Sequence, residues 1–146
     1  MINPNDHIRY KNVISRRYRY HYHDINNVMK EFINDLVQLN VTFKGPMFYS
    51  INNVPMDEIV IGEFYMPIEE EFVEGLQDME FHSYFSIEDM ISICIYDDLE
   101  RKTEMAYLAL FQHIEKNNCR QTTPIFHILS GDETLQYMFI KVGMSM

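Results

Sequence analysis

The feature that most constrains the fold is an apolar pentapeptide that the chain carries twice. The stretch PMFYS begins at Pro46, and the similar stretch PIFHI begins at Pro124, 78 residues further on. The same offset matches Met66 with Met144 without a gap. A fixed internal spacing of this kind predicts a duplication in which both halves of the chain fold into the same unit.

The first half has the pattern of a strand, a helix and two further strands. Aromatic and basic side chains alternate in VISRRYRYHYHD, and apolar residues then recur at helical spacing after an N-cap at Asp24 or Asn26. Gly45 and Pro46 end the helical region, and the turn-rich stretch NNVPMD separates the last two strands. The predicted elements are a strand at 13–24, a helix at 25–40, and strands at 47–52 and 58–66.

The second half repeats this order of elements. DMISICIYDD predicts a strand, ERKTEMAYLALFQHIEKNN a helix, and TPIFHIL and TLQYMFIKVGM two strands that a Ser-Gly-Asp turn separates. We therefore expect one domain over residues 1–146, made of two repeats at about 8–68 and 81–146. The acidic segment 69–80 is predicted to be a solvated connector between them.

The fold class follows from the size of each repeat. Three strands and one helix bury their faces poorly alone, whereas two such units can share a core. The sequence predicts an α+β fold in which two βαββ repeats form one antiparallel sheet. Both helices would cover one face of that sheet, with pseudo-twofold symmetry. Edge strands could pair into a homodimer, although nothing in the residues requires it.

Composition and charge narrow the classes of partner. The chain has a formal net charge of −10 at pH 7, although residues 1–24 are net positive. Binding of phosphate groups needs a basic face, so we expect no nucleic-acid partner. The basic segment is either a patch for another partner or an ordinary solvated strand face.

The sequence also predicts a cytoplasmic protein with no membrane segment, no cofactor and no metal. No apolar run approaches the roughly 18 residues that span a bilayer, and the polar start MINPNDHIRY does not resemble a signal peptide. Cys94 and Cys119 lack the spacing of a disulfide framework. His21 and His23 could share a metal ion, but they lack an evident third ligand and arginines flank them.

The duplicated plan resembles the GyrI-like, or SOUL-type, effector-binding domains. The stretch AYLALFQHIEKNNCRQTTPIFHILSGDETLQYMFIKVGM is similar to their second unit. The resemblance covers nearly the whole chain and implies a ligand-binding module. The stretches NNVPMDE, FHSYFSIEDMIS and TPIFHILSGDETLQY resemble an uncharacterised family of small proteins from Gram-positive bacteria. That second resemblance implies a genomic association with secreted toxins of the LXG type.

One position departs from the GyrI-like pattern. Those domains usually place a buried glutamate just after the proline of the second unit's proline-led strand, where it faces cationic drugs. In PIFHI, Phe126 or His127 stands in its place. The resemblance therefore does not by itself imply that this chain senses cationic ligands.

Candidate binding residues lie on the last strand of each half. Strand alternation places Glu63 and Tyr65 on one face, with Lys141 and Tyr137 on the corresponding face of the second half. The opposite, apolar face, which carries Phe64 in the first half, is predicted to pack beneath the helices. The offset of 78 makes Glu63 and Lys141 equivalent, so they could meet in an aromatic cleft. The alternative is an exposed surface ion pair. The predicted ligand-binding residues are Tyr20, Glu63, Tyr65, Phe126, His127, Tyr137 and Lys141.

These observations favour a binding function without catalysis. No phosphate loop, nucleophile elbow or zinc-protease motif is present, and the two repeats leave no room for a helix-turn-helix. The leading hypothesis is a module that binds a small ligand or peptide in the aromatic cleft. The alternative is a protein-interaction or immunity factor of a secreted-toxin system. An enzyme that uses Glu63 or His127 as general base is a third hypothesis.

Overall fold

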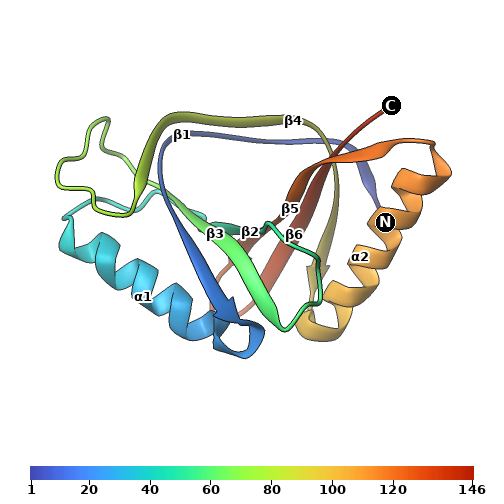
Figure 1. Ribbon diagram of the computed structural model, residues 1–146, viewed down its shortest axis with the longest axis horizontal. Coiled ribbons are helices and arrows are strands. Elements are labelled where there is room, and N and C mark those ends of the chain that lie inside the picture. The colour runs from blue at the N-terminus through green and yellow to red at the C-terminus, as the bar shows by residue number, and fades with distance from the viewer. The chain divides into compact units, whose positions relative to one another are not determined.

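The chain folds into two compact units, each of which contains one α-helix. The computed structural model describes all residues from 1 to 146 (Figure 1). The N-terminal unit comprises Arg9–Phe85, and the C-terminal unit comprises Ser86–Met146 together with Met1–Ile8. The predicted connector therefore belongs to the N-terminal unit. Most of its residues are exposed and lack regular structure, as its acidic composition predicts.

The N-terminal unit has the predicted order of a strand, a helix and two strands. Strand β1 (Asn3–His21) starts in the other unit and leads through a short 3-10 turn (Tyr22–Asp24) into helix α1 (Ile25–Gln38). Strands β2 (Phe48–Ile51) and β3 (Ile59–Pro67) follow. Strand β3 lies between the other two and pairs antiparallel with both.

The C-terminal unit repeats this order and this pairing. Its elements are β4 (Glu80–Tyr96), which starts in the N-terminal unit, α2 (Leu99–Lys116), β5 (Arg120–Gly131) and β6 (Gln136–Ser145). Strand β6 pairs antiparallel with both β4 and β5. The six antiparallel strands and two α-helices confirm the α+β class. The placement of both helices on a common sheet face stays a prediction. Neither helix is long and apolar enough to cross a membrane.

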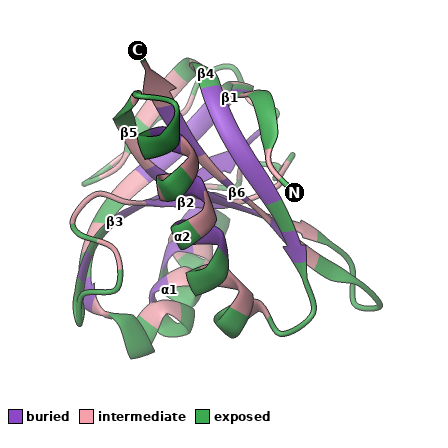
Figure 2. Cartoon of the chain, turned by 90° about the vertical axis from the view of Figure 1, so that its right-hand side faces the viewer, coloured by how far each residue is buried: buried purple, intermediate pink, exposed green.

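Each helix covers one face of its own strands. In α1 the buried residues Val28, Phe32 and Leu36 recur every four positions and form one apolar stripe. The ring of Phe32 lies 6.1 Å from that of Phe64 on β3 and 6.4 Å from that of Tyr18 on β1. Figure 2 shows the buried residues of the helices and strands in purple. As predicted, the face of β3 that carries Phe64 therefore packs beneath a helix.

Helix α2 buries only some of its large apolar side chains. Ala106, Tyr107, Leu110 and Ile114 face the strands, whereas Met105 is more than half exposed. The buried residues form one cluster with side chains of β4, β5 and β6. The strand residues of this cluster are Ile91, Ile93, Ile95, Ile125, Met138, Ile140 and Val142.

The pairing registers correct the predicted equivalence of Glu63 and Lys141. Phe48 pairs with Tyr65, whereas its counterpart Phe126 pairs with Lys141. Lys141 therefore corresponds to Tyr65, and the offset between β3 and β6 is two residues shorter than the offset between β2 and β5. A gapless alignment of the sequence misses this shift because the hairpin loops of the two units differ in length. A shift of two residues keeps every side chain on its face.

Candidate functional site

The face of β3 opposite helix α1 carries a buried carboxylate. Glu63 and Tyr65 alternate with Phe64 along the strand, so they point away from the helix. Only 8% of Glu63 and 5% of Tyr65 is exposed. Burial of a carboxylate is costly unless a cation or hydrogen bonds compensate it, so the surroundings of Glu63 define the candidate site.

Four aromatic rings gather beside Glu63 on this face. The rings of Phe48 and Tyr65 are stacked with centroids 4.6 Å apart and planes 7° from parallel. Tyr10 stacks on Phe48 at 5.3 Å, and Phe85 lies 4.9 Å from Tyr65 and 5.6 Å from Phe48. We call Tyr10, Phe48, Tyr65 and Phe85 the aromatic face. Such rings supply flat apolar surface, with negative potential above each ring plane.

The charge of Glu63 is balanced by an exposed arginine. Arg17 lies directly opposite Glu63 in the β1–β3 ladder, and its Nε donates to Glu63 Oε1 at 3.2 Å. The arginine side chain is 73% exposed, whereas that of Glu63 is 10% exposed. Burial raises the pKa of Tyr65 far above its usual range, and the nearby charge of Glu63 raises that pKa further. The phenol of Tyr65 therefore stays protonated at neutral pH.

A histidine and a second glutamate lie close to Glu63. Ser15 Oγ is hydrogen bonded to His82 Nε2 at 2.9 Å, and Glu80 Oε2 lies 3.9 Å from the same nitrogen. The sequence did not predict this cluster. The available signal was the E-F-H spacing, because strand alternation puts Glu80 and His82 on one face.

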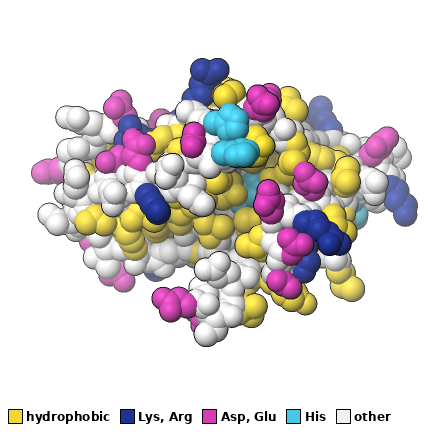
Figure 3. Space-filling model, turned by 90° about the horizontal axis from the view of Figure 1, so that it is seen from below, with side chains coloured by type: hydrophobic (Ala, Val, Ile, Leu, Met, Phe, Trp, Pro, Cys, Tyr) yellow, Lys and Arg dark blue, Asp and Glu magenta, His cyan; other side chains and the backbone are white.

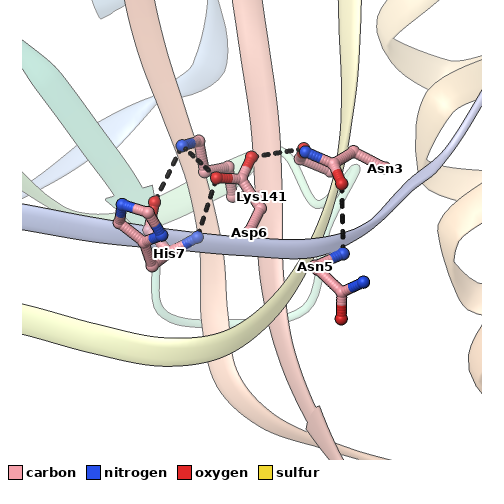
Figure 4. A network of polar contacts seen from close by, with 6 residues as sticks. Asn3, Asn5, Asp6, His7 and Lys141 are labelled. Carbon is pink, nitrogen blue, oxygen red and sulfur yellow. Dashed lines mark hydrogen bonds and ion pairs between the residues drawn. The ribbon is translucent and has the colours of Figure 1, made fainter.

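Lys141 belongs to a partly buried polar network within the C-terminal unit (Figure 4). Its Nζ donates to Asp6 Oδ1 at 3.0 Å and to the His7 carbonyl at 2.8 Å. Ser92 Oγ also donates to Asp6, at 2.5 Å. Burial alone would raise the pKa of Asp6, but the bonds from Ser92 and the His7 amide, with the charge of Lys141, lower it overall.

Two further predicted residues share the face of Lys141. Phe126 pairs directly with Lys141 and is almost fully buried. Tyr137 and Phe139 precede Lys141 by four and two positions, so strand alternation sets all three side chains on one face. The rings of Tyr137 and Phe139 contact each other there. Glu63 and Lys141 thus each have an ion-pair partner within their own unit, and their meeting in one cleft stays a prediction.

The other two predicted residues point toward the helices. Tyr20 pairs with Val60, and its ring lies 6.1 Å from that of Phe64 in the core beneath α1. His127 pairs with Ile140, and its Nε2 is hydrogen bonded to the hydroxyl of Tyr107 on α2. Strand alternation therefore sets Tyr20 and His127 on the face opposite Glu63 and Lys141, and their role in ligand binding stays a prediction.

Comparisons with known proteins identify a family and a fold. The model of a domain of unknown function, DUF5085, matches residues 9–145. No curated protein matches the sequence. The chain is similar to EcmrR in the cryo-EM structure of the EcmrR–DNA complex in EcmrR-RPo, with a TM-score of 0.75 and 14% sequence identity. That match covers 99% of this chain but 57% of EcmrR, so the chain spans little more than half of EcmrR's length.

Two further structures match most of both chains. The EcmrR C-terminal domain has a TM-score of 0.70 at 13% identity, and the match covers 97% of this chain and 98% of that domain. A hydrolase from Listeria innocua has a TM-score of 0.59 at 8% identity, covering 97% of this chain and 91% of the hydrolase. At these identities the likeness shows a shared fold. The predicted association with LXG toxins stays a prediction.

Proposed function

We propose that this chain, which belongs to the DUF5085 family, is a non-enzymatic module that binds a small organic ligand on its aromatic face. One observation carries the proposal: the buried carboxylate of Glu63 lies beside stacked aromatic rings, and its cationic partner Arg17 is exposed. The shared fold with the EcmrR C-terminal domain, together with the GyrI-like sequence pattern, supports a ligand-binding role.

The chemistry of the site favours a flat ligand with a cationic group. A ligand ammonium or amidinium could replace the Arg17 guanidinium on Glu63, since Arg17 can move into solvent without leaving a buried charge behind. The partly exposed rings of Tyr10 and Phe85, which pack on Phe48 and Tyr65, would then contact the apolar part of the ligand. Besides Glu80 and His82, the groups around Glu63 are a guanidinium, a phenol and aromatic rings, which suit the binding of a flat cation.

A thermal-shift screen tests the proposed function. The purified protein is melted with a library of small aromatic cations and neutral analogues of matched size. We expect a binding compound to raise the melting temperature of the wild type by several degrees and to have little effect on Glu63→Gln. The matched control is Glu74→Gln, an exposed glutamate of the same unit, which should respond like the wild type. Equal responses of the wild type and Glu63→Gln would refute a role for this carboxylate.

Exposed apolar side chains favour a second candidate, a protein-interaction or immunity factor for a secreted toxin. In the N-terminal unit, Val54, Met56 and Phe72 are each more than 60% exposed. Hydrophobic side chains are also visible between polar ones on the surface seen from below (Figure 3). Large exposed apolar side chains are of the kind that protein interfaces bury. This candidate predicts that a neighbouring gene product co-purifies with the wild type and is lost on Phe72→Ser, while Glu63→Gln retains it.

A further inference from the structure

We propose that Glu63, Glu80 and His82 form a binding site for a divalent transition-metal cation, with Zn²⁺ as the preferred ion. One potential ligand atom from each residue lies within 4.8 Å of the other two. All three residues belong to the N-terminal unit, on β3 and the first residues of β4. The site extends beyond the proposed ligand function, which needs neither Glu80 nor His82.

The donor set selects the class of metal. An imidazole nitrogen suits zinc and its neighbours in the first transition row, whereas Mg²⁺ and Ca²⁺ prefer oxygen ligands alone. Three protein ligands leave a fourth position for water or for a donor atom of a bound molecule. Two carboxylates also neutralise the charge of a divalent ion.

The local geometry already holds two of the ligands close to a binding arrangement. Ligand atoms around a tetrahedral zinc ion at about 2.0–2.1 Å stand about 3.3–3.4 Å apart, so shifts of about 1 Å would close the cluster. The strand ladder fixes the position of Glu63 opposite Arg17. The edge-on ring of Phe85 packs against the imidazole of His82. Ser15 is hydrogen bonded to Nε2 of that imidazole, so a metal ion bound at Nε2 would displace the serine hydroxyl.

The electrostatics of Glu63 provide an independent argument. Its side chain is nine-tenths buried, so its charge needs a cation close by. Arg17 contributes a single hydrogen bond of 3.2 Å from a side chain that is largely in solvent. A metal ion would compete with Arg17 for this carboxylate. Removal of the guanidinium should therefore raise metal affinity.

The proposed metal site does not include the H-x-H pair of His21 and His23 that the sequence analysis considered as metal ligands. The His21 ring nitrogen Nδ1 accepts a hydrogen bond from the His23 amide at 3.2 Å, and the two rings meet edge to face. Nδ1 is thereby engaged at the end of β1. His23 is exposed and serves as the histidine control for the proposed site.

Isothermal titration of the metal-free protein with ZnCl₂ at about pH 7.5 tests the proposal. We expect one Zn²⁺ per chain, with affinity reduced at least tenfold in Glu80→Gln and in His82→Gln. His23→Gln and Glu74→Gln should match the wild type, and Arg17→Gln should bind more tightly. Melting curves in EDTA establish that each variant is folded. Because Glu80 is exposed, its variant is informative even if His82→Gln is unstable.

Two outcomes would overturn the metal site. One is the absence of saturable zinc binding in both the wild type and Arg17→Gln. The other is saturable binding that Glu80→Gln leaves unchanged. The screen for organic ligands is run in EDTA, so that failure of the metal site and failure of the proposed ligand function give separate results.

Discussion

The Asp6–Lys141 ion pair should contribute strongly to the stability of the fold. The two side chains are only 15% and 13% exposed, and removal of one partner from a fully buried pair costs about 3–5 kcal/mol. Asp6→Ala leaves Lys141 with the His7 carbonyl alone and deprives the buried Ser92 hydroxyl of its acceptor. With a discount for residual exposure, we expect Asp6→Ala to lower the free energy of unfolding by about 3 kcal/mol.

Urea unfolding of a double-mutant cycle measures this contribution. Lys141→Met removes the cation, and the Asp6→Ala/Lys141→Met double variant should be less destabilised than the sum of the single variants by about 2 kcal/mol. The exposed pair of Asp98 and Arg101, whose closest atoms are 4.0 Å apart, is the control. Its variant Arg101→Met should change stability by less than about 0.5 kcal/mol. Additive effects of the two Asp6–Lys141 substitutions would refute the reasoning.

Two further predictions follow from burial. Because folding lowers the pKa of Asp6, its contribution to stability is present above about pH 4, the unfolded value, and is lost as pH falls through the folded value. The stability difference between the wild type and Asp6→Asn, measured by urea unfolding, should therefore shrink below about pH 4; a constant difference would contradict this. The buried Tyr20 hydroxyl lacks a hydrogen-bond partner, so Tyr20→Phe should raise stability by about 1 kcal/mol in the same assay. A loss of stability would show that the hydroxyl is satisfied.

The sequence predicted the type and order of the regular elements, because hydrophobic periodicity is a local property. Helix α1 begins at Ile25, as predicted, and ends two residues before the predicted end. The face of β3 that packs beneath α1 was also predicted from alternation alone. Strands β1 and β4 extend well beyond their predicted starts. The early segment of β1 is polar and carries little periodic signal, whereas that of β4 contains Phe81, Tyr84 and Phe85 without strict alternation.

The candidate site was only partly predictable, because hydrophobic periodicity is local whereas the contacts of a site join distant segments. The placement of Glu63 and Tyr65 on a shared face followed from strand alternation, but their burial did not, because the sequence also allowed an exposed ion pair. Which partners meet them depends on strand register and on contacts between distant segments. Arg17 and His82 reach Glu63 through such pairings, and the sequence assigns them no common motif.

The two units use equivalent positions in opposite ways, which explains why we place the function in the N-terminal unit. Tyr65 and Lys141 hold equivalent positions in the two units. Ser15 pairs with Tyr65 and Ser92 pairs with Lys141, so the two serines are equivalent as well. In the C-terminal unit, Lys141 and Asp6 are both nearly buried and satisfy each other. In the N-terminal unit, the carboxylate of Glu63 is buried but its partner Arg17 lies in solvent. Replacement of Arg17 by another cation leaves no buried charge unpaired, whereas displacement of Asp6 or Lys141 would. The C-terminal pair is therefore suited to stabilise the fold, and the N-terminal carboxylate is suited to exchange partners.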